Sequence, residues 1–451
     1  MPTQPLTREL ITMAAISKRA RSAVWAGAVI ALVSLGACDT LSNPLEVEPA
    51  SRIPAADIES SGNAQILLDG AVADFECAFG SYTAIGGLVG EEFVYAEQTA
   101  ARAPYDRRST TPSEPIYATA SCSGLGVYTP LQTARGSSDN ILTRLKGWTD
   151  AEVAAGAGAP NRTALIAIAA AYAGYSYVLL GEGFCTSAIS TINPDRSINY
   201  GGEIQRDSVF RVAVARFTEA IAATAAAPAS ATNTSIRTMA FLGRARAKLD
   251  LGDYAGAKAD AGQVPAGFLR PVTASDASGR RQNLIASLNT LANTQFSVGE
   301  PYISMMDARV PITVTTRVSA TGVRHVYQTK YPTTGTAFPL ATYEEAQLII
   351  AEADIRAGSL ATALPILTAS RTRGGQGAFT GTTQPQYLAE LIDQRRRELF
   401  AESHHLGDVI RFNIALQPAV GAAYHFGGNY GTQICLPLPL AERLNNPMIG
   451  G

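Results

Sequence analysis

The spacing of apolar residues constrains the fold of this 451-residue chain more than any other feature of its sequence. Over long stretches they recur at intervals of three and four, as amphipathic helices require, and the clearest stretches end at Trp148, Phe184 and Thr224. Two long irregular regions interrupt this pattern: residues 69–128, which are rich in Gly, Ser, Thr and Pro, and the polar residues 264–342. We therefore expect a mainly α-helical scaffold with long loops, where a binding surface would most naturally lie.

Two segments have the pattern of tetratricopeptide-like helical hairpins. Residues 235–265 and 342–375 each place small residues where two helices would cross, and each has a glycine turn between its helices, at Gly252 and Gly358. The region between the hairpins contains short strand-like pieces, RVPITVTTRV and RHVYQTKYP. The expected fold is thus a scaffold of such hairpins with long irregular loops and a few short strands.

The first 38 residues have the order of a lipoprotein signal peptide. Basic residues precede an apolar run from Ala23 to Leu35, which is too short to span a bilayer as a permanent helix. The run leads into Leu-Gly-Ala-Cys, so we expect cleavage before Cys38 and acylation of its thiol, with palmitate among the chains that hold the protein at a membrane. An ordinary signal peptide before a coincidental cysteine is the alternative, and Asp39 leaves the membrane leaflet open. The expected organisation is a signal peptide over 1–37, a tether over 38–54 and a single domain over 55–451.

Four cysteines remain after Cys38, an even number that suits an oxidising compartment. Three pairings are possible for four cysteines. We favour Cys77 with Cys122, which flank one loop-rich stretch, and Cys185 with Cys435, which lie beside the strand-like pieces GFCTSAI and ICLPLPL. No pair has the short spacing of a zinc knuckle, so we expect no metal site.

The charge and the motif content argue against several classes of function. The formal net charge of -2 offers no clustered positive surface for nucleic-acid phosphates. The signatures GxSxG, GxxxxGK and HExxH are absent, so nothing marks a serine hydrolase, an NTPase or a zinc protease. A surface hydrolase with two facing carboxylates stays a further possibility, although no pair among the 38 acids stands out. We therefore expect a binding protein with no catalytic residues and no cofactor.

The segment LAELIDQRRRELFAESHHLGDVIRFN contains closely spaced charges of both signs. Because several lie about one helical turn apart, we interpret them as ion pairs and helix-end contacts. The alternative is a metal site or an acid–base set formed by Glu398, Glu402, His404, His405 and Asp408. The expected ion-pair motif consists of Arg395, Arg396, Glu398, Glu402, Asp408 and Arg411.

This segment resembles the hallmark of the SusD/RagB family, in which an Arg-Arg-Arg-Glu-Leu helix runs into Glu-x-His-x-x-x-Asp-x-x-Arg. YEEAQLIIAEADIRAG is similar to that family's Glu-x-x-Leu-Ile-x-Ala-Glu-Ala helix, and ICLPLPLAERLNNPMI is similar to its closing motif. The order and spacing of the three motifs also agree. The departures are His405 and Leu406, which replace an arginine and an aromatic residue and concern local packing.

The resemblance implies a cell-surface lipoprotein of the outer membrane that serves nutrient uptake. Such a protein captures glycans, or in one branch peptides, and delivers them to a SusC-like TonB-dependent transporter. A tetratricopeptide-type envelope scaffold that binds another protein is the alternative.

Sugars stack on aromatic rings and hydrogen-bond to planar polar groups, so we expect the ligand in the loop regions. The candidate ligand-binding residues are Tyr95, Arg102, Tyr105, Arg107 and Tyr302. The plainer interpretation is that these tyrosines cap the core or are solvated.

Overall fold

Helices form the framework of the protein in the computed structural model, which describes residues 59–193 and 195–449. All of the described residues fall in one compact unit. The expected signal peptide, the expected lipidation site Cys38 and the expected tether lie outside the described residues.

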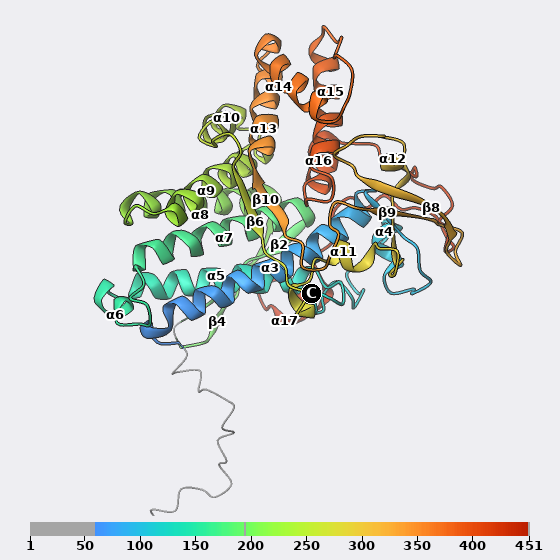
Figure 1. Ribbon diagram of the computed structural model, residues 1–451. Helices are drawn as coiled ribbons and strands as arrows, with labels where there is room; N and C mark the ends of the chain where they lie inside the picture. The colour runs from blue at the N-terminus through green and yellow to red at the C-terminus, as the bar shows by residue number, and fades with distance from the viewer. Residues whose placement is uncertain (1–58, 194, 450–451) are drawn as a thin grey trace, which may run out of the picture. The chain divides into compact units, whose positions relative to one another are not determined.

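The first half of this unit is a layer of long helices that lie side by side (Figure 1). They are α3 (Ala64–Val89), α5 (Tyr128–Gly147), α7 (Arg162–Gly183), α8 (Arg206–Ala226) and α9 (Ala231–Asp250), with the short α6 (Asp150–Ala154) between α5 and α7. Among the described residues, α7 alone is long and apolar enough to cross a membrane, but 83% of its apolar window is buried by its neighbours. We therefore interpret α7 as the central helix of the core.

α3 overturns part of the expectation for residues 69–128, because the helix continues to Val89 where we expected a loop. Its second half is buried on nearly every side, including Gly80, Ser81 and Gly87. A helix covered all round has no apolar stripe, so its sequence lacks the periodicity that marks a surface helix. Its small polar residues are accommodated by local bonds, as where the Thr83 hydroxyl donates to the Phe79 carbonyl at 2.8 Å.

A second group of helices comprises α13 (Tyr343–Arg356), α14 (Leu360–Arg373), α15 (Gln384–Glu398) and α16 (His405–Phe412). α13, α14 and α15 share a small apolar core of their own, around Leu348, Leu367 and Leu391. α13 and α14 form one of the two expected hairpins, and α9 with α10 (Tyr254–Ala261) forms the other. Gly252 and Gly358 turn these hairpins with φ of 77° and 74°, in the left-handed region that favours glycine. The mainly helical fold with tetratricopeptide-like hairpins is thus confirmed.

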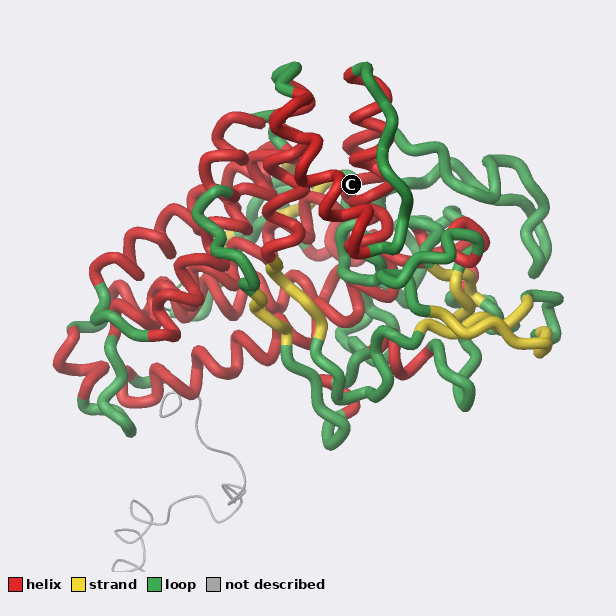
Figure 2. The backbone as a smooth tube through the Cα atoms, turned by 45° about the horizontal axis from the view of Figure 1, so that its top comes forward, coloured by secondary structure: helices red, strands yellow, loops and turns green. Residues whose placement is uncertain are grey.

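The strands are short and form two-stranded antiparallel sheets, some of which contact the helices while β8 and β9 extend among the loops (Figure 2). The pairs are β1 (Phe93–Tyr95) with β7 (Phe296–Val298), β2 (Thr186–Ala188) with β5 (Glu203–Gln205), β3 (Thr191–Ile192) with β4 (Ile198–Asn199), β6 (Leu269–Val272) with β10 (Phe338–Thr342), and β8 (Ile312–Val318) with β9 (Arg324–Gln328). The strand-like pieces expected between the hairpins correspond to β8 and β9. Short helices complete the loop regions: η1 (Ser61–Asn63), α4 (Ala103–Asp106), η2 (Gly279–Arg281), α11 (Leu284–Leu288), α12 (Glu300–Ile303) and α17 (Leu440–Asn445).

Two disulfides join segments that are distant in the sequence. They pair Cys77 with Cys122 and Cys185 with Cys435, the arrangement favoured from the sequence. Beside the second bond, the backbone N–H of Cys185 donates to the Leu436 carbonyl at 2.9 Å. The end of α7 is thereby fastened to the C-terminal segment.

Candidate functional site

The six residues of the expected ion-pair motif are all paired with opposite charges. Arg395 and Arg411 both bind Asp408, Arg396 binds Glu91, Glu398 binds Arg309 and Arg373, and Glu402 binds Lys330. The five residues considered as a metal or acid–base set include His404 and His405, and these too have protein partners, Glu345 and Tyr302. Among the described residues, no group of three or more His, Cys, Asp and Glu side chains is arranged to hold a metal ion.

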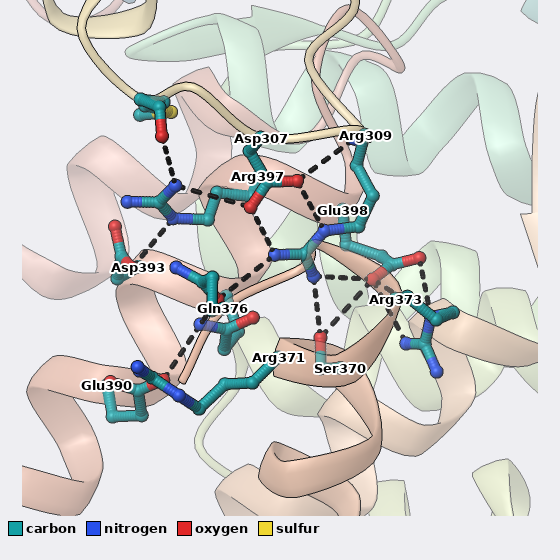
Figure 3. A network of polar contacts seen from close by, with 12 residues as sticks. Asp307, Arg309, Ser370, Arg371, Arg373, Gln376, Glu390, Asp393, Arg397 and Glu398 are labelled. Carbon is teal, nitrogen blue, oxygen red and sulfur yellow. Dashed lines mark hydrogen bonds and ion pairs between the residues drawn. The ribbon is translucent and has the colours of Figure 1, made fainter. Parts of the chain in front are cut away.

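A polar network fastens the loop after α12 to α15 (Figure 3). Asp307 lies between two guanidinium groups: Arg309 at 2.8 Å and Arg397 at 3.2 Å. Arg309 also binds Glu398 at 2.8 Å, and Arg397 donates to the Met305 carbonyl at 3.2 Å. Arg397 and Glu398, at the end of α15, thus hold residues 305–309 in place.

Arg396 connects the motif to a second loop. Its guanidinium lies 4.7 Å from the centre of the Tyr302 ring, in α12, and pairs with Glu91, in the turn after α3. Glu91 has a φ of 65°, which a side-chain-bearing residue seldom adopts. Such strain persists only where the surroundings hold it, and it often occurs at functional sites. The motif therefore positions both the turn after α3 and the segment around α12.

A cavity of about 220 Å³ lies where these two segments meet residues 417–430. Its deep side is formed by Leu88, Val89 and Phe93, from the end of α3 and from β1, all of them buried. Its rim includes Glu300 and Gln417, which are exposed. Loop segments more than 300 positions apart in the sequence thus enclose one space with apolar depth and a polar rim.

Asp106 is a buried carboxylate in the wall of this cavity. Its Oδ2 accepts hydrogen bonds from the Tyr95 backbone N–H at 2.9 Å and from the Tyr424 hydroxyl at 3.1 Å. Burial raises the pKa of Asp106 to about 7, because these two bonds and the more distant Arg108 only partly offset the loss of hydration. Asp106 therefore changes its charge near neutral pH.

Arg108 is the cation of the cavity wall, and it is 4% exposed. It donates to the Pro418 carbonyl and lies 4.7 Å from the centre of the Tyr430 ring, whereas its Nε has no hydrogen-bond partner in the part of the chain that the structure describes. Burial lowers the pKa of this guanidinium. Its φ of 57° is a second left-handed backbone in the same wall. A buried donor without a partner is costly, so the cavity has an unmet capacity to bind an acceptor.

None of the five expected ligand-binding residues is among the residues that line this cavity, and the rings of the three tyrosines are buried. Tyr95, Tyr105 and Tyr302 are 0%, 1% and 0% exposed. A ring covered on both faces has no surface on which a sugar could stack, so stacking by these three residues does not fit this structure. Arg102 binds Gln295, and Arg107 donates to the Ser109 hydroxyl at 2.9 Å, and both are partly exposed beside the cavity wall.

The residues that line the cavity were not among the candidates chosen from the sequence, although those between 88 and 108 lie in the irregular region 69–128. Arg108, Glu300 and Gln417 come from three separate segments and share no motif or spacing. Arg108 follows Arg107, Glu300 precedes Tyr302 by two positions, and Gln417 precedes the cis peptide at Pro418. None of these positions predicts from the sequence that the three residues meet at one cavity.

Comparison with known proteins identifies the fold of the chain. Residues 286–435 match the model of the SusD family. A SusD-like carbohydrate binding protein from Bacteroides vulgatus covers 86% of this chain and 97% of its own, with 14% identity and a TM-score of 0.65. The chain therefore has the SusD fold, and its residues 286–435 match the SusD family model. No curated protein sequence matches the chain.

Two more solved structures have the same SusD fold. Surface glycan-binding protein A from Bacteroides thetaiotaomicron, in complex with laminarihexaose, covers 85% of this chain and 97% of its own, with 14% identity and a TM-score of 0.65. A SusD superfamily protein from Bacteroides vulgatus covers 86% and 98%, with 12% identity and a TM-score of 0.64. The SusD-family segment of this chain contains the residues from α12 to Tyr430 that form two of the three sides of the cavity.

Proposed function

We propose that this protein binds glycans at the cell surface and delivers them to a TonB-dependent outer-membrane transporter. The observation that carries the proposal is a cavity built from the loops of a SusD fold, whose wall contains the buried Arg108 with an Nε that has no partner among the described residues. Two proteins of the same fold support the ligand class, one described as carbohydrate binding and one bound to laminarihexaose.

The proposed binding is non-catalytic. The carboxylates of the C-terminal motif are occupied by arginine and lysine partners, so they are not free to transfer protons to a glycosidic bond. The membrane attachment and the transporter partner rest on the sequence of the N-terminus and on the resemblance to the SusD/RagB family.

Titration calorimetry of the intact protein against a panel of oligosaccharides tests the ligand class. The panel contains laminarihexaose, cellohexaose, maltohexaose and xylohexaose, together with peptides of similar length. We expect saturable binding of at least one glycan and no release of shorter products on prolonged incubation. Binding of peptides alone contradicts the glycan proposal, and product release contradicts the non-catalytic role.

Purification from the native membrane tests the transporter and the anchor. We expect a β-barrel transporter to co-purify with the protein in mild detergent, and mass spectrometry to find an acylated N-terminal Cys38. A Cys38→Ala variant is the control, because it should lose the acyl chains while its ligand binding stays unchanged. An unmodified N-terminus contradicts the anchor, and failure of the purified pair to associate contradicts the delivery role.

A further inference from the structure

The cavity between the three loop segments has a buried apolar side. Leu88 and Val89 are each 1% exposed and Phe93 is 0% exposed, so helix α3 and strand β1 cover this side of the cavity. The rim residues Glu300, Gln417 and Pro418 are exposed. A space with a buried apolar side and an exposed polar rim favours the end of a chain over the middle of a long polymer.

The volume of the cavity limits what such a chain end could be. About 220 Å³ corresponds to the liquid volume of roughly seven water molecules. A single sugar ring fits this description, whereas a stretch of several rings would extend past the rim. Gly299 adds to the close fit of the wall, because a Cβ there would overlap the Glu91 carbonyl.

The polar groups of the wall suit a group that both donates and accepts hydrogen bonds. Arg108 has a free Nε donor, while the carboxylates of Asp106 and Glu300 are acceptors. A sugar hydroxyl donates one hydrogen bond and accepts others, so it can satisfy both kinds of partner. A ligand that only accepts, such as a carboxylate, would offer no donor to Glu300 or to Oδ1 of Asp106, whose Oδ2 already accepts from Tyr95 and Tyr424.

The charge of the wall disfavours an anionic ligand. Glu91 is neutralised by Arg396 and accepts from the Gln417 backbone N–H. This leaves the cation Arg108 in one wall with two carboxyl groups: the buried Asp106, which is partly ionised at neutral pH, and the exposed Glu300. A uronate or a sulfated sugar placed there would be repelled by the charge of Glu300 and by the ionised fraction of Asp106.

From this geometry we infer that the cavity holds the terminal, uncharged sugar unit of an oligosaccharide, which enters end-on. Arg108 and Asp106 bind its hydroxyls, and Glu300 at the rim excludes acidic sugars. This inference rests on the proposed glycan-binding function and goes beyond it, because it states which part of the glycan is recognised and which class is rejected.

A bulky side chain at the rim tests the location. Gln417→Trp places an indole at the mouth, and since residue 417 is exposed and contributes its backbone N–H to Glu91, the fold should be preserved. We expect at least a tenfold higher Kd for the hexaose that binds best in the panel. Gln98→Trp is the matched control, because Gln98 is exposed and does not line the cavity, and its Kd should match that of the wild type.

Modification of the chain ends tests the end-on orientation. The same hexaose is reduced to its alditol at one end or blocked by an alkyl group at the other, and each form is titrated separately. We expect one of the two modifications to raise Kd at least tenfold and the other to leave it unchanged. Equal affinity for the hexaose and both modified forms overturns the inference.

An acidic ligand tests the charge rule. Hexagalacturonate should bind at least tenfold more weakly than the neutral hexaose, and Glu300→Gln should narrow that difference. Preference for hexagalacturonate overturns the inference, as does a peptide N-terminus that occupies the cavity and is displaced by Gln417→Trp. If no hexaose binds, the proposed function itself is contradicted. If a hexaose binds but its Kd changes neither with Gln417→Trp nor with modification of its ends, only the end-on inference is contradicted.

Discussion

Asp408 and Asp106 are both buried carboxylates, 5% and 4% exposed, yet their pKa values move in opposite directions. Burial alone would raise the pKa of Asp408, but Arg395 and Arg411, each at 2.8 Å, hold that pKa well below its usual range. Asp106 has no cation at contact distance, so its pKa rises. At the scale of single residues, the neighbouring charge decides the ionisation state that burial alone would disfavour.

Removal of the Asp408 charge should destabilise the protein strongly. Asp408→Asn leaves Arg395, which is 4% exposed, without its carboxylate, and breaking a buried pair in this way costs about 3–5 kcal/mol. Urea denaturation followed by circular dichroism measures the change. The matched control is Glu203→Gln, which removes a surface partner of Arg443 and should cost at most about 1 kcal/mol. Equal losses for the two variants would contradict the ion-pair interpretation.

The raised pKa of Asp106 predicts a loss of stability toward alkaline pH. The folded-state pKa of about 7 exceeds the ordinary value of 3.8, so the folded protein binds the extra proton between these values. The contribution of this group to stability is therefore full below pH 4 and is lost as the pH rises through 7. Asp106→Asn should remove about 2–3 kcal/mol of the decrease in unfolding free energy between pH 5 and 8. Urea denaturation at pH 5 and pH 8 measures the free energy of unfolding. The exposed Asp69→Asn is the control. The same change in unfolding free energy with pH for Asp106→Asn and for the wild type would refute the prediction.

Close helix packing depends on glycines that admit an aromatic ring. Phe217 of α8 is fully buried between Gly174 of α7 and Gly243 of α9, and its ring meets Tyr175 edge-on at 5.1 Å between centroids. A Cβ at Gly174 would lie 2.7 Å from the Phe217 ring, and one at Gly243 would overlap it. At the scale of elements, the three helices can approach one another only because two of them lack a side chain at the crossing.

Replacement of one of these glycines by alanine should destabilise the protein, although alanine is usually the better helix former. Gly243→Ala raises helix propensity but overpacks the core, so we expect a net loss of about 1–3 kcal/mol in the free energy of unfolding. Gly70→Ala, in α3, meets no atom within 4 Å and should instead gain about 0.5–1 kcal/mol. Thermal and urea unfolding of the two variants measure both signs. A gain for Gly243→Ala would show that the Phe217 ring can move aside.

The whole molecule is held together by contacts between distant parts of the chain. The Arg396–Glu91 pair and the Arg309–Glu398 pair connect α15 to the loops that enclose the cavity. The Cys185–Cys435 bond closes a loop of 250 residues, against 45 residues for Cys77–Cys122. The cavity therefore depends on a C-terminal third that is fastened to the helical layer both by charge and by a covalent bond.

Loss of the longer disulfide should cost more stability than loss of the shorter one. Cross-links restrict the unfolded chain more when they close longer loops. For these two loop lengths, the expected stabilisation by the disulfide differs by roughly 1.5 kcal/mol. We expect the Cys185→Ser and Cys435→Ser double variant to be less stable than the Cys77→Ser and Cys122→Ser double variant by about that amount. Urea denaturation of the two double variants measures the difference, and the opposite order would contradict the prediction.

The sequence by itself determined the helices that end near Trp148, Phe184 and Thr224 and both helical hairpins, because their signals are local: apolar spacing and a glycine turn. It also marked the residues of the charged motif, but apart from the Asp408–Arg411 pair their partners lie in other segments. Tertiary structure alone decided the rest. It buried the second half of α3 on nearly every side, so the sequence of that helix has no apolar periodicity from which it could be predicted. It also placed the rings of Tyr95, Tyr105 and Tyr302 in the core. It also brought Arg108, Glu300 and Gln417 to one cavity. Burial and cavities arise from contacts between segments hundreds of residues apart, and a local pattern carries no information about which segments will meet.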